Sequence, residues 1–419
     1  MCPVLGVSGG VAGGDYYIEE IAILAGRHLA NHYERILDRV FVSAQGSWMY
    51  DSEGKKYLDF VSCYSALNVG HGHPKVKQAI IEQADRGLWA MPQGFLNPWT
   101  VECARKICWI TGMDKVNFKN SGAEAVEAAM KIARKWAYVK RGVGDDKAEL
   151  IFCENNFHGR TFGALAASTT PQYRDFFGPH LPGVKTVPFG DYRALEAAIT
   201  KNTAAFIVEP IQGEGGIIVP PWGYLKQVRS ICNNHGVLMV ADEVQTGFGR
   251  TGRVFACQDE EVVPDMYVLG KALGGGLAIS AVAGRKDVME VLEPKDDGST
   301  FGGNPFASAA AIAAIDVIVD EDLAFSAAFS GAYLKKKLEE IARSKWFIKE
   351  VRGLGLLLGI ELAKSAPDSK DIMRAVLREG VIVNNTKPNV IRIAPPLNIS
   401  KEEMVLGLDA LEKAFSVFV

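Results

Sequence analysis

The sequence predicts an α/β fold, with a mainly parallel central sheet in a large domain and a smaller α+β domain after it. Short apolar runs bounded by turn signals alternate with helical patterns, as they do where crossover helices join parallel strands. The expected strands of the sheet are Val116 to Phe118, Leu150 to Cys153, Ala204 to Val208, Val237 to Ala241 and Met266 to Leu269. After Pro305 a long alanine-rich helix precedes two more strand patterns, Val351 to Ile360 and Val390 to Ile393.

Four parts are expected along the chain. Residues 1–20 begin with a glycine-rich stretch of small residues and predict a flexible tail. Residues 21–70 form an N-terminal segment, with a helical pattern over Ile18 to Glu34 and a hairpin of Trp48 to Asp51 and Lys56 to Phe60. Residues 71–305 make the large domain, and residues 306–419 the small one.

Composition excludes several classes of protein. The 419 residues exceed one typical core, and 48% apolar with 23% charged residues is ordinary for a globular protein. The net charge is −3 and there is no basic block, so neither nucleic acid nor an anionic membrane is an expected partner. The most apolar stretch, Phe306 to Val319, contains Asp316 and is too short to span a bilayer.

The cysteines and histidines show no metal or disulfide pattern. Seven cysteines are scattered without CxxC spacing, which favours free thiols in a reducing, cytoplasmic compartment. The N-terminus lacks the basic and apolar segments of a secretory signal. His71 and His73 have a spacing that metal ligands use, but no third ligand cluster accompanies them. A glycine turn before a helix at Pro74 explains this stretch better.

Asp242 and Lys271 each follow a predicted strand directly or within two residues. Because parallel strands end at one edge of the sheet, both side chains should face one cleft. A buried aspartate and a lysine suit pyridoxal 5′-phosphate: the amine can form a Schiff base with its aldehyde, and the carboxylate can hold its ring nitrogen protonated. From these two residues alone, an ordinary ion pair at the strand ends is an equally good interpretation.

Further motifs support the cofactor interpretation. They are Asn120 to Ala125, Phe157 to Thr161, Glu209 to Glu214, Asp242 to Gln245 followed by Gly270-Lys271, and Gly298 to Pro305. In this order they resemble the class III, or ω-amino acid, aminotransferases of fold-type I, and within them the ornithine branch. The resemblance runs from about Gly46 to the C-terminus. It implies a pyridoxal-phosphate enzyme with Lys271 and Asp242 as its catalytic residues.

The resemblance also implies how the cofactor is held. Ser121, Gly122 and Ala123 would bind its phosphate at a helix N-terminus, although a serine cap without a ligand explains this motif alone. Thr300 would reach the phosphate of a neighbouring subunit, so a homodimer with shared sites is implied. Around the ring the resemblance places Phe157 and Val244 on its two faces, Gln245 at its hydroxyl, and Glu209 nearby. Taken singly, Phe157 is a core aromatic and Glu209 a solvated loop acid.

Four residues would meet the substrates. Arg160 matches the arginine that binds a distal carboxylate, as a bidentate guanidinium can. Glu214 and Arg392 match a gate: closed, Glu214 masks Arg392, and open, Arg392 takes an α-carboxylate. Tyr64 matches a pocket residue of the ornithine branch, although a core tyrosine is the alternative. One departure concerns an upstream tyrosine of that branch, which is missing here unless Tyr33 partly replaces it.

These observations predict transfer of the terminal (δ) amino group of L-ornithine to 2-oxoglutarate, giving glutamate 5-semialdehyde and glutamate. Another ω-aminotransferase, using N-acetylornithine, lysine, 4-aminobutyrate or a diamine, is the nearest alternative. A racemase or aminomutase on the same fold would also keep Lys271 and Asp242 but would need no 2-oxoglutarate. A binding protein without activity is disfavoured by the intact Lys271, Asp242 and Gln245.

Overall fold

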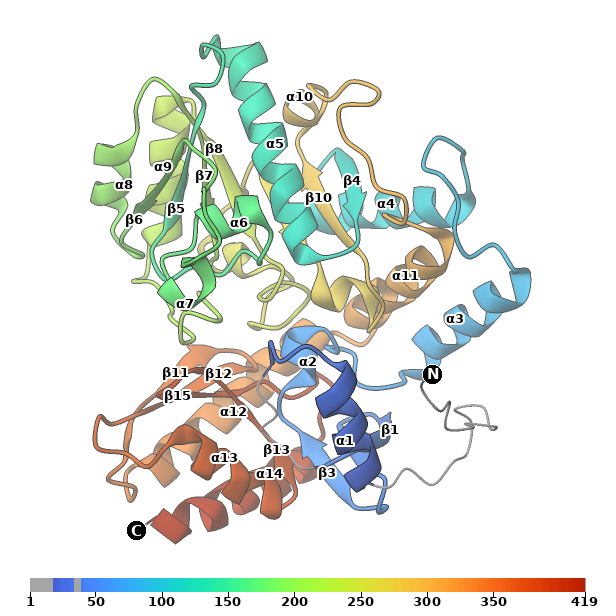
Figure 1. Ribbon diagram of the computed structural model, residues 1–419, viewed down its shortest axis with the longest axis vertical. Coiled ribbons are helices and arrows are strands. Elements are labelled where there is room, and N and C mark those ends of the chain that lie inside the picture. Colours follow the sequence, from blue (N-terminus) through green and yellow to red (C-terminus); the bar gives the residue numbers. More distant parts are fainter. Residues whose placement is uncertain (1–17, 34–38, 419) are drawn as a thin grey trace.

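The computed structural model describes residues 18–33 and 39–418 (Figure 1). It has an upper body around one large sheet and a lower body that contains both the first and the last described elements. The predicted tail lies outside the described residues except for its last three, which begin helix α1 (Ile18–His28). The helix expected over Ile18 to Glu34 therefore ends early at His28, and Glu34 itself is not among the described residues.

The central sheet has seven strands in the order β4-β10-β9-β8-β7-β5-β6. Their bounds are β4 (Lys115–Lys119), β5 (Glu149–Cys153), β6 (Val184–Val187), β7 (Thr203–Val208), β8 (Leu238–Asp242), β9 (Met266–Leu269) and β10 (Ser280–Gly284). Strands β5 to β9 run parallel, and β10 runs antiparallel to both of its neighbours. The mainly parallel sheet is thus confirmed, with β6 and β10 as strands that the sequence analysis missed.

Helices cover both faces of this sheet, which explains its continuous apolar strands. Ala205 and Ile207 of β7 pack in the cluster that contains helix α5 (Gly122–Arg141), whereas Phe206 and Val208 pack in the cluster on the opposite face with α9 (Tyr224–His235). The other helical elements of the upper body are α3 (Pro74–Arg86), α4 (Pro98–Thr111), α6 (Phe162–Ala166), α7 (Pro171–Arg174), α8 (Tyr192–Ala198), α10 (Lys286–Met289), η1 (Ala256–Glu260) and η2 (Lys271–Gly274).

The lower body follows helix α11 (Pro305–Asp320) and is built around an antiparallel sheet in the order β11-β12-β15-β14. Its elements are α12 (Leu323–Ala342), β11 (Ile348–Leu354), β12 (Leu357–Leu362), α13 (Ser369–Arg378), β14 (Asn384–Lys387), β15 (Val390–Ile393), α14 (Lys401–Phe415) and η3 (Ser416–Phe418). The single strand predicted over Val351 to Ile360 is wrong. The chain reverses at Gly355, whose φ of 54° permits the turn, because an apolar run carries no information about direction.

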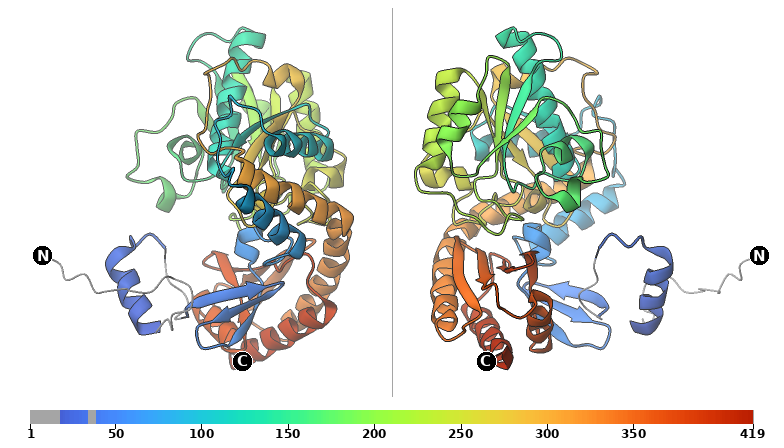
Figure 2. Two further views of the ribbon diagram at one scale, coloured as in Figure 1. Left: turned by 90° about the vertical axis from the view of Figure 1, so that its right-hand side faces the viewer. Right: turned by 60° about the vertical axis from the view of Figure 1, so that its left-hand side comes forward.

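The N-terminal strands belong to the lower body, as Figure 2 shows. Strands β1 (Phe41–Gln45), β2 (Trp48–Asp51) and β3 (Lys56–Asp59) form the predicted hairpin and its neighbour. Strand β3 then pairs in parallel with β13 (Val381–Ile382), with Leu58 opposite Val381. This pairing joins the N-terminal segment to residues more than 300 positions later; the division into four parts stays a prediction.

A buried arginine connects the two bodies. The side chain of Arg250 is fully buried, and its Nη1 donates to the carbonyls of Leu356 (2.9 Å) and Pro395 (2.6 Å). Its Nη2 donates to Oδ1 of Asn68 (2.6 Å), which lies after the short turn α2 (Ser62–Ser65). Burying a guanidinium costs free energy unless it is hydrogen-bonded, so these contacts hold together the three segments that contain Asn68, Leu356 and Pro395.

No helix in the described ranges is long and apolar enough to cross a bilayer.

Candidate active site

A cavity of about 210 Å³ lies at the carboxyl ends of the parallel strands β7, β8 and β9. Its wall is formed by Gly122, Ala123, Phe157, His158, Gly159, Glu209, Ile211, Glu214, Asp242, Val244, Gln245, Thr246 and Lys271. The sequence analysis predicted most of these residues. Ser121 adjoins this wall at the start of α5, whereas Tyr64, Arg160, Arg392 and Thr300 do not line the cavity.

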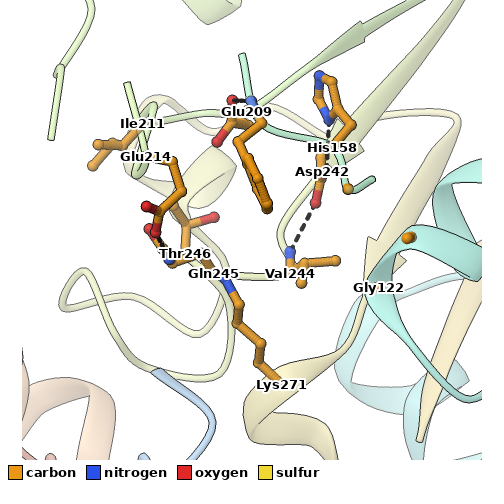
Figure 3. A pocket seen from close by; sticks show the side chains of 13 residues that line it. Gly122, His158, Glu209, Ile211, Glu214, Asp242, Val244, Gln245, Thr246 and Lys271 are labelled. Carbon is orange, nitrogen blue, oxygen red and sulfur yellow. Dashed lines mark hydrogen bonds and ion pairs between the residues drawn. The ribbon is translucent and has the colours of Figure 1, made fainter. Parts of the chain in front are cut away.

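Asp242, the last residue of β8, has a histidine behind it (Figure 3). Its Oδ2 lies 2.6 Å from Nδ1 of His158, and its Oδ1 accepts the N–H of Val244 (3.1 Å). Both side chains are buried. Burial lowers the pKa of His158, but the hydrogen bond and charge of Asp242 outweigh this and raise it. The pair therefore keeps a fixed carboxylate at the inner end of the cavity.

Glu209 is a second buried carboxylate beside Asp242. It accepts the N–H groups of Phe157 (3.0 Å) and Gly213 (3.4 Å). Burial raises the pKa of Glu209 to about 7; His158 opposes this shift and the charge of Asp242 adds to it. Glu209 thus fixes the backbone of Phe157 and can change its charge near neutral pH.

Lys271 stands two residues after β9 and points toward Gln245 and Glu214 (Figure 3). Its φ of 46° is in the left-handed region, which costs a residue with a Cβ atom about 1 kcal/mol or more and often marks active sites. Burial lowers the pKa of Lys271; the Glu214 carboxylate opposes this and Arg392 reinforces it. With the Gln245 amide turned so that its oxygen faces these two donors, the oxygen accepts from Lys271 Nζ (2.9 Å) and Arg392 Nη1 (3.2 Å).

The N-terminus of α5 faces the cavity through Gly122 and Ala123. Ser121 Oγ accepts the N–H of Glu124 (3.3 Å), and the Glu124 carboxylate accepts the N–H of Ser121 (2.7 Å). A Cβ atom on Gly122 would lie 2.8 Å from Cγ1 of Val244, so glycine permits the close approach of this helix. The first N–H groups of a helix have no partner within it, and the positive end of its dipole favours an anion.

Glu214, Arg392 and Tyr64 come from three separate segments. Arg392 on β15 is fully buried, and its Nη1 lies 2.5 Å from Oε1 of Glu214. Burial would raise the pKa of Glu214, but the charges of Arg392 and Lys271 hold it below its usual value. The Arg392 guanidinium carbon lies 5.0 Å from the ring centre of Tyr64. Tyr33 is near enough to contribute to the raised pKa of Tyr64, which burial mainly causes.

Arg160 and Thr300 are exposed. The Arg160 guanidinium carbon lies 4.2 Å from the ring centre of Tyr173 and 5.9 Å from that of Phe157. No carboxylate within the described ranges pairs with Arg160. Thr300 lies within the loop between α10 and α11, which is anchored by Asp297 through its ion pairs with Lys119 (2.8 Å) and Lys131 (2.6 Å). Thr300 does not reach this chain's own cavity.

Four wall residues were not predicted as site residues: His158, Gly159, Ile211 and Thr246. His158 lies between two predicted positions, Phe157 and Arg160, and that density of site residues was a usable signal. Its partner Asp242 is 84 positions away, so only the fold reveals the contact.

His71 precedes helix α3 and binds Asp59 Oδ2 (2.8 Å). In the described part of the chain, no group of His, Cys, Asp or Glu could hold a metal ion.

Comparison with known proteins identifies the family. The model described as "Aminotransferase class-III" matches residues 29–415. An ornithine aminotransferase of Geobacillus sp. (strain WCH70) is 49% identical over 398 residues, which are 95% of this chain and 98% of that protein. An ornithine aminotransferase of Brevibacillus brevis is 47% identical over 92% of this chain and 96% of its own length.

Solved structures agree with this result. The crystal structure of the ornithine aminotransferase from Toxoplasma gondii ME49 has a TM-score of 0.94 and 41% identity, with 96% of each chain covered. That of an acetylornithine aminotransferase from Elizabethkingia anophelis has a TM-score of 0.87 and 40% identity, with 96% of this chain and 99% of that chain covered. The chain therefore belongs to the class III aminotransferases, which use pyridoxal 5′-phosphate to move an amino group from an amino donor to a keto acid.

Proposed function

We propose that this aminotransferase transfers the terminal amino group of L-ornithine to 2-oxoglutarate. The observation that carries the proposal is the partly buried Glu214–Arg392 ion pair next to the ring of Tyr64. When closed, the pair neutralises Arg392, so this arginine would not repel an incoming ω-amine; when open, it would receive a dicarboxylate. The names of the Geobacillus and Brevibacillus relatives, both ornithine aminotransferases, support the same donor.

The cavity fits pyridoxal 5′-phosphate. The N-terminus of α5, with Ser121, Gly122 and Ala123, suits its phosphate because glycine leaves room and the helix dipole favours an anion. Phe157 and Val244 would flank the ring, and Gln245 would bind its hydroxyl. When bound, the cofactor supplies an electron sink for a carbanion at the substrate carbon. Bound cofactor would compete with Gln245 and Glu214 for the Lys271 amine.

Two of the chain's own groups would handle protons. Asp242, held by His158, would keep a proton on the ring nitrogen, because its buried carboxylate stabilises that positive charge. Lys271 must be neutral to accept a proton from the substrate carbon, and burial lowers the pKa of its amine in that direction. Glu209 would support Asp242 and fix Phe157 through its backbone N–H.

The two arginines would alternate in substrate binding. With the pair closed, Glu214 neutralises Arg392 while the ω-amine of the donor approaches Lys271. With the pair open, Arg392 would bind the α-carboxylate of 2-oxoglutarate and Arg160 the distal carboxylate. Arg160 suits this role because its guanidinium lies over aromatic rings and pairs with no carboxylate of the described residues. Tyr64 would shape the donor side of the cavity.

A homodimer would complete the site. Thr300 is exposed in a loop that Asp297 anchors, and it would reach the phosphate bound by a partner subunit. The cytoplasmic location that the sequence analysis predicted stays a prediction.

A donor panel tests the proposal. Ornithine, N-acetylornithine, lysine, 4-aminobutyrate and putrescine would each be assayed with 2-oxoglutarate, and glutamate formation measured. We expect ornithine to have the highest kcat/KM. N-acetylornithine is the second candidate, since the Elizabethkingia acetylornithine enzyme shares the fold at 40% identity. A higher kcat/KM with N-acetylornithine would refute the ornithine assignment, and activity independent of 2-oxoglutarate would indicate a racemase or aminomutase.

A further inference from the structure

Four consecutive residues beside the cavity form a left-handed turn. The φ angles of Ser62, Cys63, Tyr64 and Ser65 are 46°, 46°, 60° and 73°, and none of the four is glycine. The left-handed region is unfavourable for residues with a Cβ atom, which normally visit it singly. A run of this length persists only where surrounding groups enforce it. Those groups therefore control where the third residue, Tyr64, places its ring.

Asp59 is the first of these groups. Its Oδ1 accepts the N–H of Val61 (2.8 Å) and the N–H of Ser62 (2.9 Å), at the entry to the turn. Its Oδ2 bonds Nε2 of His71 at 2.8 Å. The side chain is 2% exposed, so water does not compete for these bonds. Asp59 thereby fixes the direction in which the chain leaves β3.

A second set of contacts, two hydrogen bonds, joins the turn to the end of the strand that carries Arg392. Ser62 Oγ donates to the carbonyl of Ala394 (2.8 Å), and the N–H of Ala394 donates to the carbonyl of Phe60 (2.7 Å). Ala394 is two residues beyond Arg392. Both bonds are made to Ala394, so they hold the turn beside the end of β15, close to the 5.0 Å contact between Tyr64 and Arg392.

We propose that Asp59, supported by His71, is a positioning residue for donor choice, acting through the left-handed turn on Tyr64. This inference rests on the proposed function, in which the closed Glu214–Arg392 pair favours an ω-amine. The ring covers one side of Arg392 while Glu214 occupies another. If the turn relaxes, the ring leaves, and Arg392 becomes accessible to α-carboxylates. Glutamate then competes better with ornithine as a donor.

The chain contains a matched control for Asp59. Asp51 is also 2% exposed, and its Oδ1 also accepts two backbone N–H groups, from Glu53 (3.0 Å) and Lys55 (2.9 Å). Its Oδ2 accepts the hydroxyl of Tyr57 (2.9 Å). Asp51 therefore fixes a turn of similar construction that touches neither Tyr64 nor Arg392. Loss of Asp51 measures the general cost of losing such a carboxylate.

The test is a double-mutant cycle on the holoenzyme. Asp59→Ala, Tyr64→Ala and the double variant would be compared by the ratio of kcat/KM for ornithine to kcat/KM for glutamate. We expect Asp59→Ala to lower this ratio about tenfold in the presence of Tyr64 and to leave it unchanged in the Tyr64→Ala background. Asp59→Asn, whose amide oxygen can still accept both N–H groups, should retain most of the ratio. Asp51→Ala should lower Tm without changing the ratio of kcat/KM for ornithine to kcat/KM for glutamate.

Two results would overturn the proposal: an unchanged ratio in Asp59→Ala, or an equal further change when Tyr64 is already alanine. If Asp59→Ala does not fold, the variant Ser62→Ala takes its place in the same cycle. Ser62→Ala removes only the hydrogen bond from the Ser62 hydroxyl to the carbonyl of Ala394. Failure of the ornithine assignment is separately visible, because the wild type would then prefer another ω-amine in the donor panel. The ratio would be taken between that amine and glutamate, and the cycle would keep its meaning.

Discussion

The inner and outer ends of the cavity are built in different ways. At the inner end, Asp242 ends β8 and Lys271 follows the adjacent parallel strand β9; Asp242 is buried against His158 and Lys271 is partly buried beside Gln245. Tyr64, Arg160 and Arg392, which make up the outer end in this comparison, lie beyond the cavity wall and come from a turn, a loop of the upper body and strand β15 of the lower body. The expected reaction chemistry is therefore carried by residues at the ends of strands of one sheet, and the expected choice of substrate by contacts between separate segments.

This difference predicts two kinds of mutational effect. A change at the inner end should slow every donor by the same factor, because all donors share the chemical step. A change at the outer end should alter the ratio between donors. The following tests run from the largest expected effect to the smallest.

Lys271→Ala should abolish transamination with all donors, by roughly 10⁴-fold or more, because it removes the amine that would accept the proton from the substrate carbon. Borohydride treatment of the wild-type holoenzyme, followed by peptide mass mapping, should find the reduced cofactor on Lys271. A cofactor adduct on a different lysine would contradict this assignment of the inner end.

Asp242→Asn should keep the fold and lower kcat by about 10³-fold for ornithine and glutamate alike, since a neutral amide does not stabilise a protonated ring nitrogen. Steady-state kinetics with both donors measure it. His158→Gln serves as a milder companion, because Asp242 keeps its charge but loses its 2.6 Å partner. Near-normal turnover in Asp242→Asn would mean that this carboxylate is only structural.

Glu214→Ala should change the ratio rather than the overall rate. It leaves Arg392 unpaired, so glutamate should improve as a donor relative to ornithine by roughly ten- to a hundredfold, as loss of a partly buried charge pair worth about 1–3 kcal/mol allows. Single-turnover absorbance changes of the bound cofactor with each donor give the two rates. Glu214→Gln separates charge from shape. An unmoved ratio in both variants would remove the main support for the gate.

Thr300→Ala should weaken cofactor binding about tenfold through the loss of one hydrogen bond to a phosphate. Because each subunit would contribute to its partner's site, cofactor removal should also promote dissociation of the dimer. Sedimentation velocity with and without cofactor checks both effects. A stable monomer with full activity would contradict the shared site.

The smallest effect concerns the pH at which the apoprotein captures pyridoxal phosphate. Capture needs the neutral amine of Lys271, so its rate should rise with pH through the pKa of that amine, which burial holds below its usual value. Glu214 raises this pKa and Arg392 lowers it. The midpoint should therefore move to lower pH in Glu214→Ala and to higher pH in Arg392→Met. Stopped-flow absorbance measures it; shifts of the same sign would show that the two ends are not coupled electrostatically.

The sequence was informative where local pattern decides structure. Met266 to Leu269 and Val390 to Ile393 were predicted with the bounds they have, because each is a short segment dominated by large apolar residues, with Arg392 as the one charged member. The residues of β10, Ser280 to Gly284, are small and give little apolar signal, so that strand was missed. The pairing of β3 with β13 and the hairpin at Gly355 depend on contacts that local pattern does not contain.

The same division applies to the site. Asp242, Lys271 and the start of α5 were found because they stand at strand and helix ends, where ligands bind in α/β sheets. Neither His158 behind Asp242 nor Asp59 behind the turn of Tyr64 was expected, since each acts through a partner that only the fold brings close. Residues expected to contact ligands belong to recognisable sequence motifs. The residues that hold those side chains in place belong to such motifs less often.

The parallel pairing of β3 with β13 has a consequence for synthesis. Val381 follows its partner Leu58 by 323 residues (381 − 58), so the sheet β1-β2-β3-β13 lacks its last strand until nearly the whole chain has been made. At typical elongation rates of about 5–20 residues per second, this interval is roughly 15 to 65 s. During that time β3 exposes an unpaired edge, the kind of surface that aggregates. The upper body can fold first, and the nascent lower body is the part that a chaperone would need to protect.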